Sequence, residues 1–172
     1  MPLVPFPDCD ATGTKITGYA VKIEVADGCA DLRPEEADWL VLGAMTTKDK
    51  NISINSVESD ADDTAGLVEK LATTAALDIS YEGEVFDKSP AIYYGYERLQ
   101  QLLFLKISER KQPTIWVRMT EGDVRFSYFA VLDGDLSSSG GTNDIRTFSG
   151  TFALSRADSF LLERMSELPV VP

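Results

Sequence analysis

Three carboxylates that lie close together along the chain are the first residues that could carry out a reaction. A pair such as Asp78 and Glu82, or Glu82 and Glu84, could in principle hydrolyse a glycosidic bond, one as acid and one as nucleophile. They alternate with apolar residues over positions 77–81, however, and charged residues that alternate in this way usually form the wet side of a β-strand. We therefore interpret them as the solvent-facing side of a strand and predict no catalytic role.

A second acidic cluster resembles a calcium-binding loop. Glu58, Asp60, Asp62 and Glu69 match the first, third, fifth and twelfth ligand positions of such a loop. The sixth position requires glycine for its sharp turn, but here it is Asp63, and no flanking helices are indicated. We predict a long, solvated acidic loop at about 56–71, and no metal or other cofactor.

Composition excludes much of the remaining chemistry. The 172 residues include no histidine, which rules out Ser-His-Asp and Cys-His catalysis and histidine metal sites. Cys9 and Cys29 are too few for a zinc site or a disulfide framework, and either free thiols or one bridge is compatible with them. The Ser137–Gly141 run lacks the strand, lysine and helix that surround a phosphate-binding loop. We expect a protein that is not an enzyme.

Aromatic residues leave one alternative function open. Trp116, Phe126, Tyr128 and Phe129 could form a stacking platform for sugars or bases, although core and interface packing explains them more simply. The alternative is therefore a monomeric carbohydrate-binding or virion-decoration β-sandwich module.

The charge of the chain is strongly negative and uneven. The formal net charge is −12, and residues 1–90 carry most of it. Such a surface repels nucleic acids and anionic membranes, which argues against binding either one through a basic patch. The N-terminus lacks the basic and apolar regions of a signal peptide, and no apolar run is long enough to span a membrane.

One long amphipathic helix is predicted from Ser89 to Arg110, at about 90–110. Ser89 is a suitable N-cap and Pro90 suits the first helical position. The apolar stripe that follows consists of Ile92, Tyr96, Leu99, Leu102, Leu103 and Ile107. This stripe must pack on a sheet, because almost everything else in the chain alternates with the period of a strand.

Six or seven strands are predicted around this helix, in an antiparallel β-sandwich or half-barrel. Their ranges are 15–26, 39–47, 48–55, 75–86, 114–121, 124–132 and 145–154, with a Gly/Ser-rich loop at 133–144 and a short helical turn within 155–165. The clearest hairpin turns at Gly122 and Asp123. We expect a single domain over 1–172, with an extended, proline-rich N-terminal arm at 1–14 and an apolar C-terminal tail at 166–172.

The order of these elements resembles the major tail tube protein of bacteriophages with long, non-contractile tails. The matching features are an N-terminal arm, a Trp-containing strand (Trp39–Gly43), a long acidic loop (Ser56–Gly66), a strand ending in acids (Leu77–Glu84), one helix, and a hairpin with its following strand. The segment Thr114–Leu154 is the most similar part, with its Gly122–Asp123 turn and a strand that ends in Asp133–Asp135. The tube proteins of contractile tails and of type VI secretion are more distant possibilities.

The resemblance implies a structural, self-assembling protein. Members of this family form six-membered rings whose sheets join edge to edge into one barrel, and the rings stack into a tube. The implied partners are further copies of the chain, the tape-measure, tail-tip and tail-terminator proteins, and double-stranded DNA that passes through without sequence-specific binding. The implied location is the virion tail, after synthesis in the host cytoplasm, with no membrane partner.

In this family, the long loop and the terminal arms bind the neighbouring ring. The resemblance therefore implies that the segments at the corresponding positions of this chain make contacts between rings. The candidates are Pro5, Phe6, Glu58, Asp60, Asp62, Asp63, Val170 and Val171, and, as a basic counterpart at the end of the predicted helix, Lys106, Arg110 and Lys111. An acidic bore would let DNA pass without holding it. We predict that a good share of five acidic residues face this lumen: Asp78, Glu82, Glu84, Glu121 and Asp123.

Overall fold

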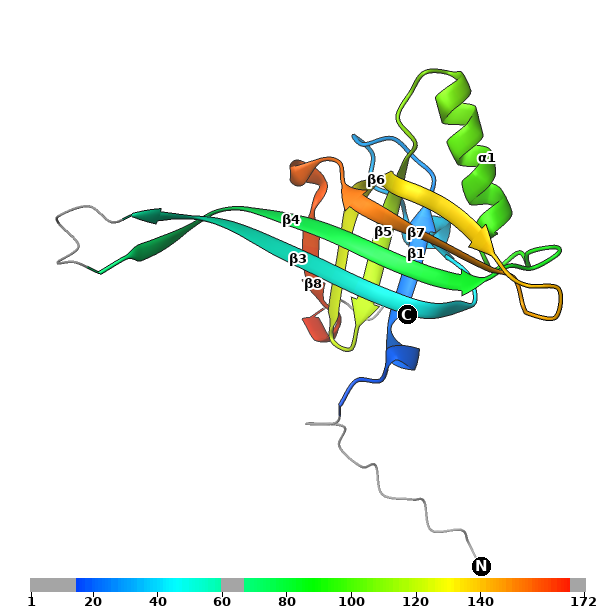
Figure 1. The fold of residues 1–172 in the computed structure, drawn as a ribbon, viewed down its shortest axis with the longest axis horizontal. Helices are drawn as coiled ribbons and strands as arrows, with labels where there is room; N and C mark the ends of the chain where they lie inside the picture. The colour runs from blue at the N-terminus through cyan, green and yellow to red at the C-terminus, as the bar shows by residue number, and fades with distance from the viewer. Residues whose placement is uncertain (1–14, 60–66, 168–172) are drawn as a thin grey trace, which may run out of the picture.

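An eight-stranded antiparallel sheet, curled into a half-barrel and flanked by one α-helix, forms the described part of the chain (Figure 1). The computed structural model describes residues 15–59 and 67–167. This confirms the predicted mainly β class. Predictions made for Pro5, Phe6, Cys9, Asp60, Asp62, Asp63, Val170 and Val171, and for the arm at 1–14 and the tail from 168 on, lie outside the described residues.

The strands are β1 (Lys22–Ala26), β2 (Leu40–Val41), β3 (Met45–Ser59), β4 (Glu69–Glu84), β5 (Thr114–Glu121), β6 (Val124–Ser139), β7 (Thr147–Leu154) and β8 (Leu161–Arg164). The helix α1 covers Gly95–Ser108, and short 3-10 turns lie at Gly18–Ala20 (η1), Glu36–Asp38 (η2), Ala157–Ser159 (η4) and Met165–Glu167 (η5). The strand order is β2-β1-β5-β6-β7-β4-β3, and β8 pairs with β6.

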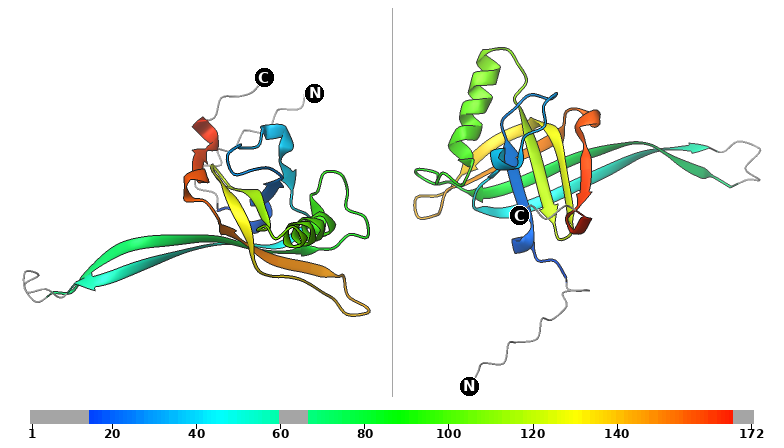
Figure 2. Two further views of the ribbon diagram at one scale, coloured as in Figure 1. Left: turned by 90° about the horizontal axis from the view of Figure 1, so that it is seen from above. Right: turned by 180° about the vertical axis from the view of Figure 1, so that it is seen from behind.

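Strand β6 belongs to two layers of the fold. Its first half, up to Val131, pairs with β5, and Val124–Ser127 also pair with β8 on the other side. From Ala130 on, β7 takes the place of β8 along that edge and pairs with the second half of β6. We call β3, β4, β7 and this second half of β6 the arm layer, and β1, β2, β5, β8 and the first half of β6 the clamp layer. Figure 2 shows the arm layer running out to either side beneath the clamp layer.

The main core lies between the two layers. Ile23 and Val117 from the clamp layer are fully buried, as are Ile79, Phe148 and Phe152 from the arm layer. These residues follow the two-residue period of their strands, so the core face of each strand is the one that the alternation predicts. Phe148 and Phe152 lie on the same side of β7, in this core.

The helix begins later than predicted. Residues Pro90 to Tyr93 form a turn, and the amides of Tyr94 and Gly95 donate to the carbonyls of Val41 and Leu42. Gly95 has a φ of +78°, a backbone conformation that residues other than glycine rarely adopt, so the helix cannot extend back to Ser89. Ile92 is consequently outside the helix and exposed, and the buried stripe centres on Leu99.

The acidic loop predicted at about 56–71 is wrong for its described parts. Strands β3 and β4 pair continuously from Met45–Gly83 to Ser59–Glu69, which makes one long hairpin that projects from the body (Figure 1). The Gly/Ser-rich loop predicted at 133–144 is also partly strand, because β6 continues to Ser139 against β7. Both segments are polar, and neither shows the apolar alternation on which the strand predictions relied.

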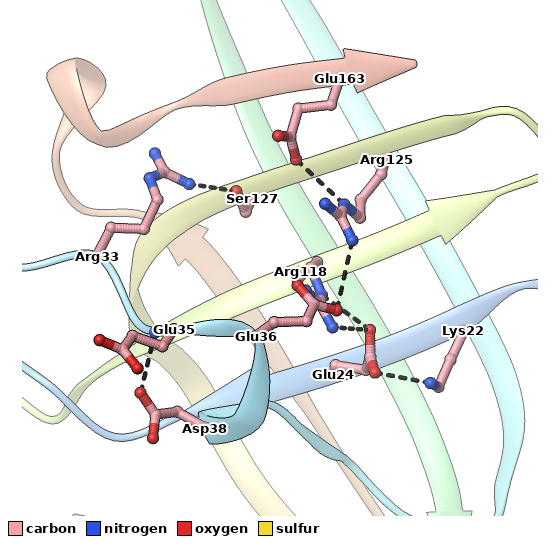
Figure 3. A network of polar contacts seen from close by, with 10 residues as sticks. All are labelled: Lys22, Glu24, Arg33, Glu35, Glu36, Asp38, Arg118, Arg125, Ser127 and Glu163. Carbon is pink, nitrogen blue, oxygen red and sulfur yellow. Dashed lines mark hydrogen bonds and ion pairs between the residues drawn. The ribbon is translucent and has the colours of Figure 1, made fainter. Parts of the chain in front are cut away.

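The predicted strands at 15–26 and 39–47 are shorter than expected. Strand β1 begins only at Lys22, after the turn η1, and the second segment divides into the two-residue β2 and the start of β3. Strand alternation puts Glu24 on the face of β1 opposite Ile23 and Val25, yet Glu24 is buried as well. A charged residue in a half-buried strand can be covered by a distant segment, and this one is covered by residues 27–39 (Figure 3).

Candidate assembly surfaces

The arm layer ends in two open strand edges. On one side, β3 is the last strand of the sheet, and within residues 15–59 and 67–167 no strand pairs with its outer edge. On the other side, β5 pairs with β6 only as far as Val131, and the amide of Leu132 donates to the carbonyl of Pro113. Among the described strands, none pairs with this edge of β6 over 133–139. Open edges present unpaired amides and carbonyls to any further strand.

The directions of the two edges are complementary. Neighbouring strands of the arm layer are antiparallel throughout, so β6 and β4 run one way and β7 and β3 the other. If a second copy is placed by rotation beside the first, its β3 meets β6 in antiparallel orientation. The layer can therefore be continued from copy to copy without a break in the alternation.

One face of the arm layer is acidic and polar. Asp78, Glu82 and Glu84 alternate with the buried Ile79 and Tyr81, so they point away from the core. The strand registers put further polar residues on the same face: Asp49 and Asn51 of β3, Ser149 and Thr151 of β7, and Asp133 and Ser137 of β6. In the described stretches 47–55, 74–84, 130–139 and 147–154, no lysine or arginine lies on this face.

Three of the five predicted lumen residues share this face, and two do not. Glu121 and Asp123 lie at the turn between β5 and β6, in the clamp layer. Glu121 forms an ion pair with Lys50, and Asp123 accepts hydrogen bonds from the amide and hydroxyl of Ser166. Sequence reasoning did not place Asp49 and Asp133 on this face. The pairing of β3 with β4, and that of the second half of β6 with β7, had not been recognised.

The hairpin of β3 and β4 carries an apolar surface that is exposed in the single chain. We call the part of this hairpin beyond Asn51 and Asp78 the arm. The exposed apolar residues on it are Ile52, Ile54, Val57, Leu67, Val68 and Leu71. Six large apolar side chains on one projecting hairpin favour contact with another protein surface over permanent solvation.

The predicted inter-ring residues that are described lie at opposite ends of the molecule. Glu58 pairs with Lys70 on the arm at 2.8 Å. Lys106, Arg110 and Lys111 lie at the end of α1, far from the arm in Figure 1. There Lys111 pairs with Glu109, and Arg110 has a φ of 57° in a turn closed by the bond from the Lys111 amide to the Lys106 carbonyl. Within one chain, these groups therefore do not meet.

A buried ion cluster fastens residues 27–39 across the clamp layer (Figure 3). The side chains of Arg118 and Glu24 are only 6% and 7% exposed, and Arg118 Nε donates to Glu24 Oε2 at 2.8 Å. Arg118 Nη1 also donates to Glu36 Oε2 at 2.7 Å, and this hydrogen bond holds the pKa of Glu36 below its ordinary value. Arg125 joins the cluster through Glu36 and Glu163.

This covering segment buries the aromatic residues considered for a stacking platform. Trp116 and Phe129 are 2% and 6% exposed and pack edge to face at 5.4 Å. Trp116 Nε1 donates to the Cys29 carbonyl, and Arg33 lies over the ring. A platform for sugars or bases needs open ring faces, so this face does not provide one.

Other binding chemistry is sparse in the part of the chain that the structure describes. Over residues 15–59 and 67–167, no group of three or more potential metal ligands is gathered in one place. None of the helices in these two ranges is long and apolar enough to cross a membrane. Cys29 is an exposed free thiol.

Two buried tyrosines differ in the hydrogen bonding of their hydroxyl groups. Tyr128 donates to the carbonyl of Phe152 at 3.0 Å. The hydroxyl of Tyr81 has no hydrogen-bond partner among the described residues, and it lies directly under Gly150, where an added Cβ would be 2.5 Å away. Burial raises the pKa of both side chains.

Comparison with known proteins gives structural matches only. No family model and no curated protein matches the chain. A chain from the tail of an empty gene transfer agent particle, determined by helical refinement with C6 symmetry, matches with a TM-score of 0.60 at 14% identity, covering 86% of this chain and 97% of that one. A chain from the virion of a native gene transfer agent particle matches with a TM-score of 0.59 at 14% identity, with the same coverage of 86% and 97%.

A third match comes from a different particle. The SPP1 tail tube, determined by solid-state NMR and cryo-EM, matches with a TM-score of 0.56 at 14% identity, covering 87% of this chain and 80% of that one. At this level of identity the likeness concerns the fold. The chain described here therefore has the fold found in the SPP1 tail tube and in the gene transfer agent tail.

Proposed function

We propose that this protein is the subunit of a phage-type tail tube. Copies join side by side, β3 of one to the second half of β6 of the next, so that the arm layers form one closed barrel. The observation that carries the proposal is the arm layer itself, with two open edges of complementary direction and one acidic face. The likeness to tail and tail tube structures supports it.

The number of copies in the ring must be large enough for the barrel to enclose a channel. Each copy contributes four strands to the barrel. Barrels of about 16–18 strands already enclose an aqueous channel, and six copies would supply about 24 strands. The C6 symmetry of the gene transfer agent tail supports six copies. The rings stack through the arm and the chain termini, which brings acidic residues such as Glu58 of one ring toward the α1 end, with Arg110 and Lys111, of the next.

The acidic face of the arm layer lines the channel in this proposal. Because this face lies opposite the core, we expect Asp78, Glu82 and Glu84, with Asp49 and Asp133, on the inside of the closed barrel. Each lysine or arginine that neutralised a DNA phosphate would add a salt-sensitive bond to the passing DNA, and this face has none in its described strands. The bore therefore conducts double-stranded DNA without holding it.

The location and partners follow from that role. The protein belongs to the virion tail, where its partners are further copies of itself and the tape-measure, tail-tip and tail-terminator proteins. It acts as a structural component and not as an enzyme.

Electron microscopy and sedimentation of the purified protein at increasing concentration test the assembly. Rings of about six copies, and tubes built from them, are expected. Material that stays monomeric up to the solubility limit, in all salt and pH conditions, contradicts the proposal.

Charge reversal inside the bore tests the role of the acidic face. Tubes of Glu82→Lys are expected to retain double-stranded DNA at low salt and to release it as salt rises. Asp87→Lys is the matched control, because it makes the same charge change in the exposed loop after β4, away from this face. Equal DNA retention by the two variants would place Glu82 outside the channel.

A further inference from the structure

Helix α1 extends past the open edge of β6. The ring of Tyr96, in its first turn, packs on Phe148 of β7 at 5.3 Å, and Phe148 is paired with Ser138 of β6. From this contact the helix runs across the strand direction, on the core side of the arm layer, and beyond β6 (Figures 1 and 2). A strand added to the edge of β6 would therefore lie beneath the second half of α1.

The side of α1 that faces this space is apolar. With 3.6 residues per turn, Leu103 and Ile107 lie on the same side as Tyr96, and Phe104 borders them. Ile107 is 58% exposed and Phe104 is 67% exposed. Leu103 is half-buried, so the exposed part of this side lies at Phe104 and Ile107, where the proposed ring adds a neighbour.

The spacing along α1 identifies the strands that it would cover. At 1.5 Å per residue, Leu103 lies about 10 Å beyond Tyr96 and Ile107 about 16 Å beyond it. Strands are about 4.8 Å apart, so measured from β7 the neighbour's β3 and β4 lie about 10 and 14 Å away. Leu103 is therefore over the neighbour's β3, and Ile107 is over its β4.

The tilt of barrel strands indicates which residues of the neighbour's β3 lie under α1. Without a shift, the column of Ser138, Phe148 and Gly83 would continue to Met45 of the neighbour. A tilt of about 35–45° displaces each four-strand unit by about 4–6 residues along the strands. This brings the core side of β3 around Lys50 and Ile52 under α1.

The surface that arrives there is an apolar groove. Ile52 and its pair Leu77 form one wall of a groove of about 350 Å³, and Phe126 and Leu162 form the other wall. Ile52 is 59% exposed and Leu162 is 60% exposed in the single chain. The rotation that relates one copy of the ring to the next thus brings the apolar side of the helix and the exposed apolar groove together.

We propose that α1 of each copy docks through Leu103, Phe104 and Ile107 into the Ile52–Leu162 groove of the adjacent copy in the same ring. The occupant is a second copy of this chain, and the inference rests on the proposed function because it needs the ring. The docked helix seals the outside of each strand seam, so the ring is held by apolar burial in addition to the backbone bonds of β3 and β6.

A matched pair of substitutions tests the docking by assembly. Ile107→Asp changes the docking side, and Leu105→Asp changes the opposite side of the same helix at a similar exposure of 55%. Loss of one buried isoleucine contact should raise the concentration needed for ring formation about tenfold to a hundredfold in Ile107→Asp. Leu105→Asp should differ from the wild type by about twofold or less. Both monomers should keep the wild-type unfolding midpoint, since both positions are exposed.

Cross-linking gives a second readout that does not depend on stability. In a background with Cys9 and Cys29 replaced by serine, Ile107→Cys protein is mixed with Ile52→Cys protein and treated with a short thiol cross-linker. Covalent dimers of unlike copies are expected in rings, and Leu105→Cys mixed with Ile52→Cys should give few.

The outcomes separate this inference from the proposed function. Wild-type protein that never forms rings contradicts the proposed function and the docking together. Rings that form normally with Ile107→Asp, or rings that give no dimers between positions 107 and 52, overturn the docking and leave the tail tube proposal in place.

Discussion

Replacing Tyr81 with phenylalanine should stabilise the fold, although it removes a polar group from an ordered site. Tyr81 is 2% exposed, stacks on Phe152 at 4.6 Å and meets Phe148 edge-on. Its hydroxyl is buried without a hydrogen-bond partner among the described residues. A hydroxyl in that situation costs about 1–3 kcal/mol by mutational measurement, so Tyr81→Phe should raise the free energy of unfolding by about that amount while keeping the ring contacts.

Tyr128 provides the matched control from the same core. It is also fully buried, but its hydroxyl donates to the Phe152 carbonyl at 3.0 Å. Loss of that bond in Tyr128→Phe should lower the free energy of unfolding by about 0.5–1.5 kcal/mol. The two chemically identical changes are thus expected to act in opposite directions and to differ by at least about 1.5 kcal/mol.

Urea unfolding of monomeric protein measures both effects. The midpoint should move up in Tyr81→Phe and down in Tyr128→Phe, with an unchanged slope, at a concentration where sedimentation shows a single copy. Gly150→Ala adds a check, because its methyl group would sit 2.5 Å from the Tyr81 hydroxyl and should be better tolerated in the Tyr81→Phe background. A loss of stability in Tyr81→Phe would refute the reasoning.

Three further predictions concern the ion cluster and the end of the helix. Arg118→Met should lower the free energy of unfolding by about 3 kcal/mol in chemical denaturation, because it leaves the buried Glu24 carboxylate with only the half-exposed Lys22 as an ion partner, and the double change with Glu24→Leu should recover most of the loss. The pKa of Glu36 is lowered in the fold, so its ion pair stabilises the protein fully above pH 4.5, the ordinary pKa of the side chain, and this stabilisation is lost as the pH falls below 4.5. In a pH series, the free energy of unfolding of Glu36→Gln should therefore fall less steeply with acid than that of the wild type. Arg110→Gly should raise the thermal midpoint by relieving the left-handed backbone, a gain of about 1 kcal/mol.

Local patterns predicted the elements that contain a clear apolar period. The hairpin of β5 and β6 follows its alternation and its Gly122 turn, and Phe148 and Phe152 mark the buried side of β7. The single helix was identified from its apolar stripe, but its start was not. The position of Gly95 depends on hydrogen bonds to Val41 and Leu42, which lie far away in the sequence.

Pairing between polar strands could not be predicted in the same way. The outer parts of β3 and β4 are exposed on both faces, so no apolar period distinguishes them from a loop. Burial of Glu24 was missed for a related reason, since alternation identifies the face of a strand but not the segment that later covers it. The first error concerns a polar hairpin, and the second concerns a contact between segments that are far apart in the sequence.

The irregular register of the two open edges limits which strands can pair with them. Long, flat edges invite pairing with any strand. Here the register of β6 shifts between Asp133 and Ser137, and that of β3 shifts between Met45 and Thr47 and again between Asn55 and Ser56. Such bulges twist an edge and leave a residue unpaired, so a chance strand fits poorly. In the proposed ring, the correct neighbour is favoured because edge direction, bulge position and the docking of the helix must all match at once.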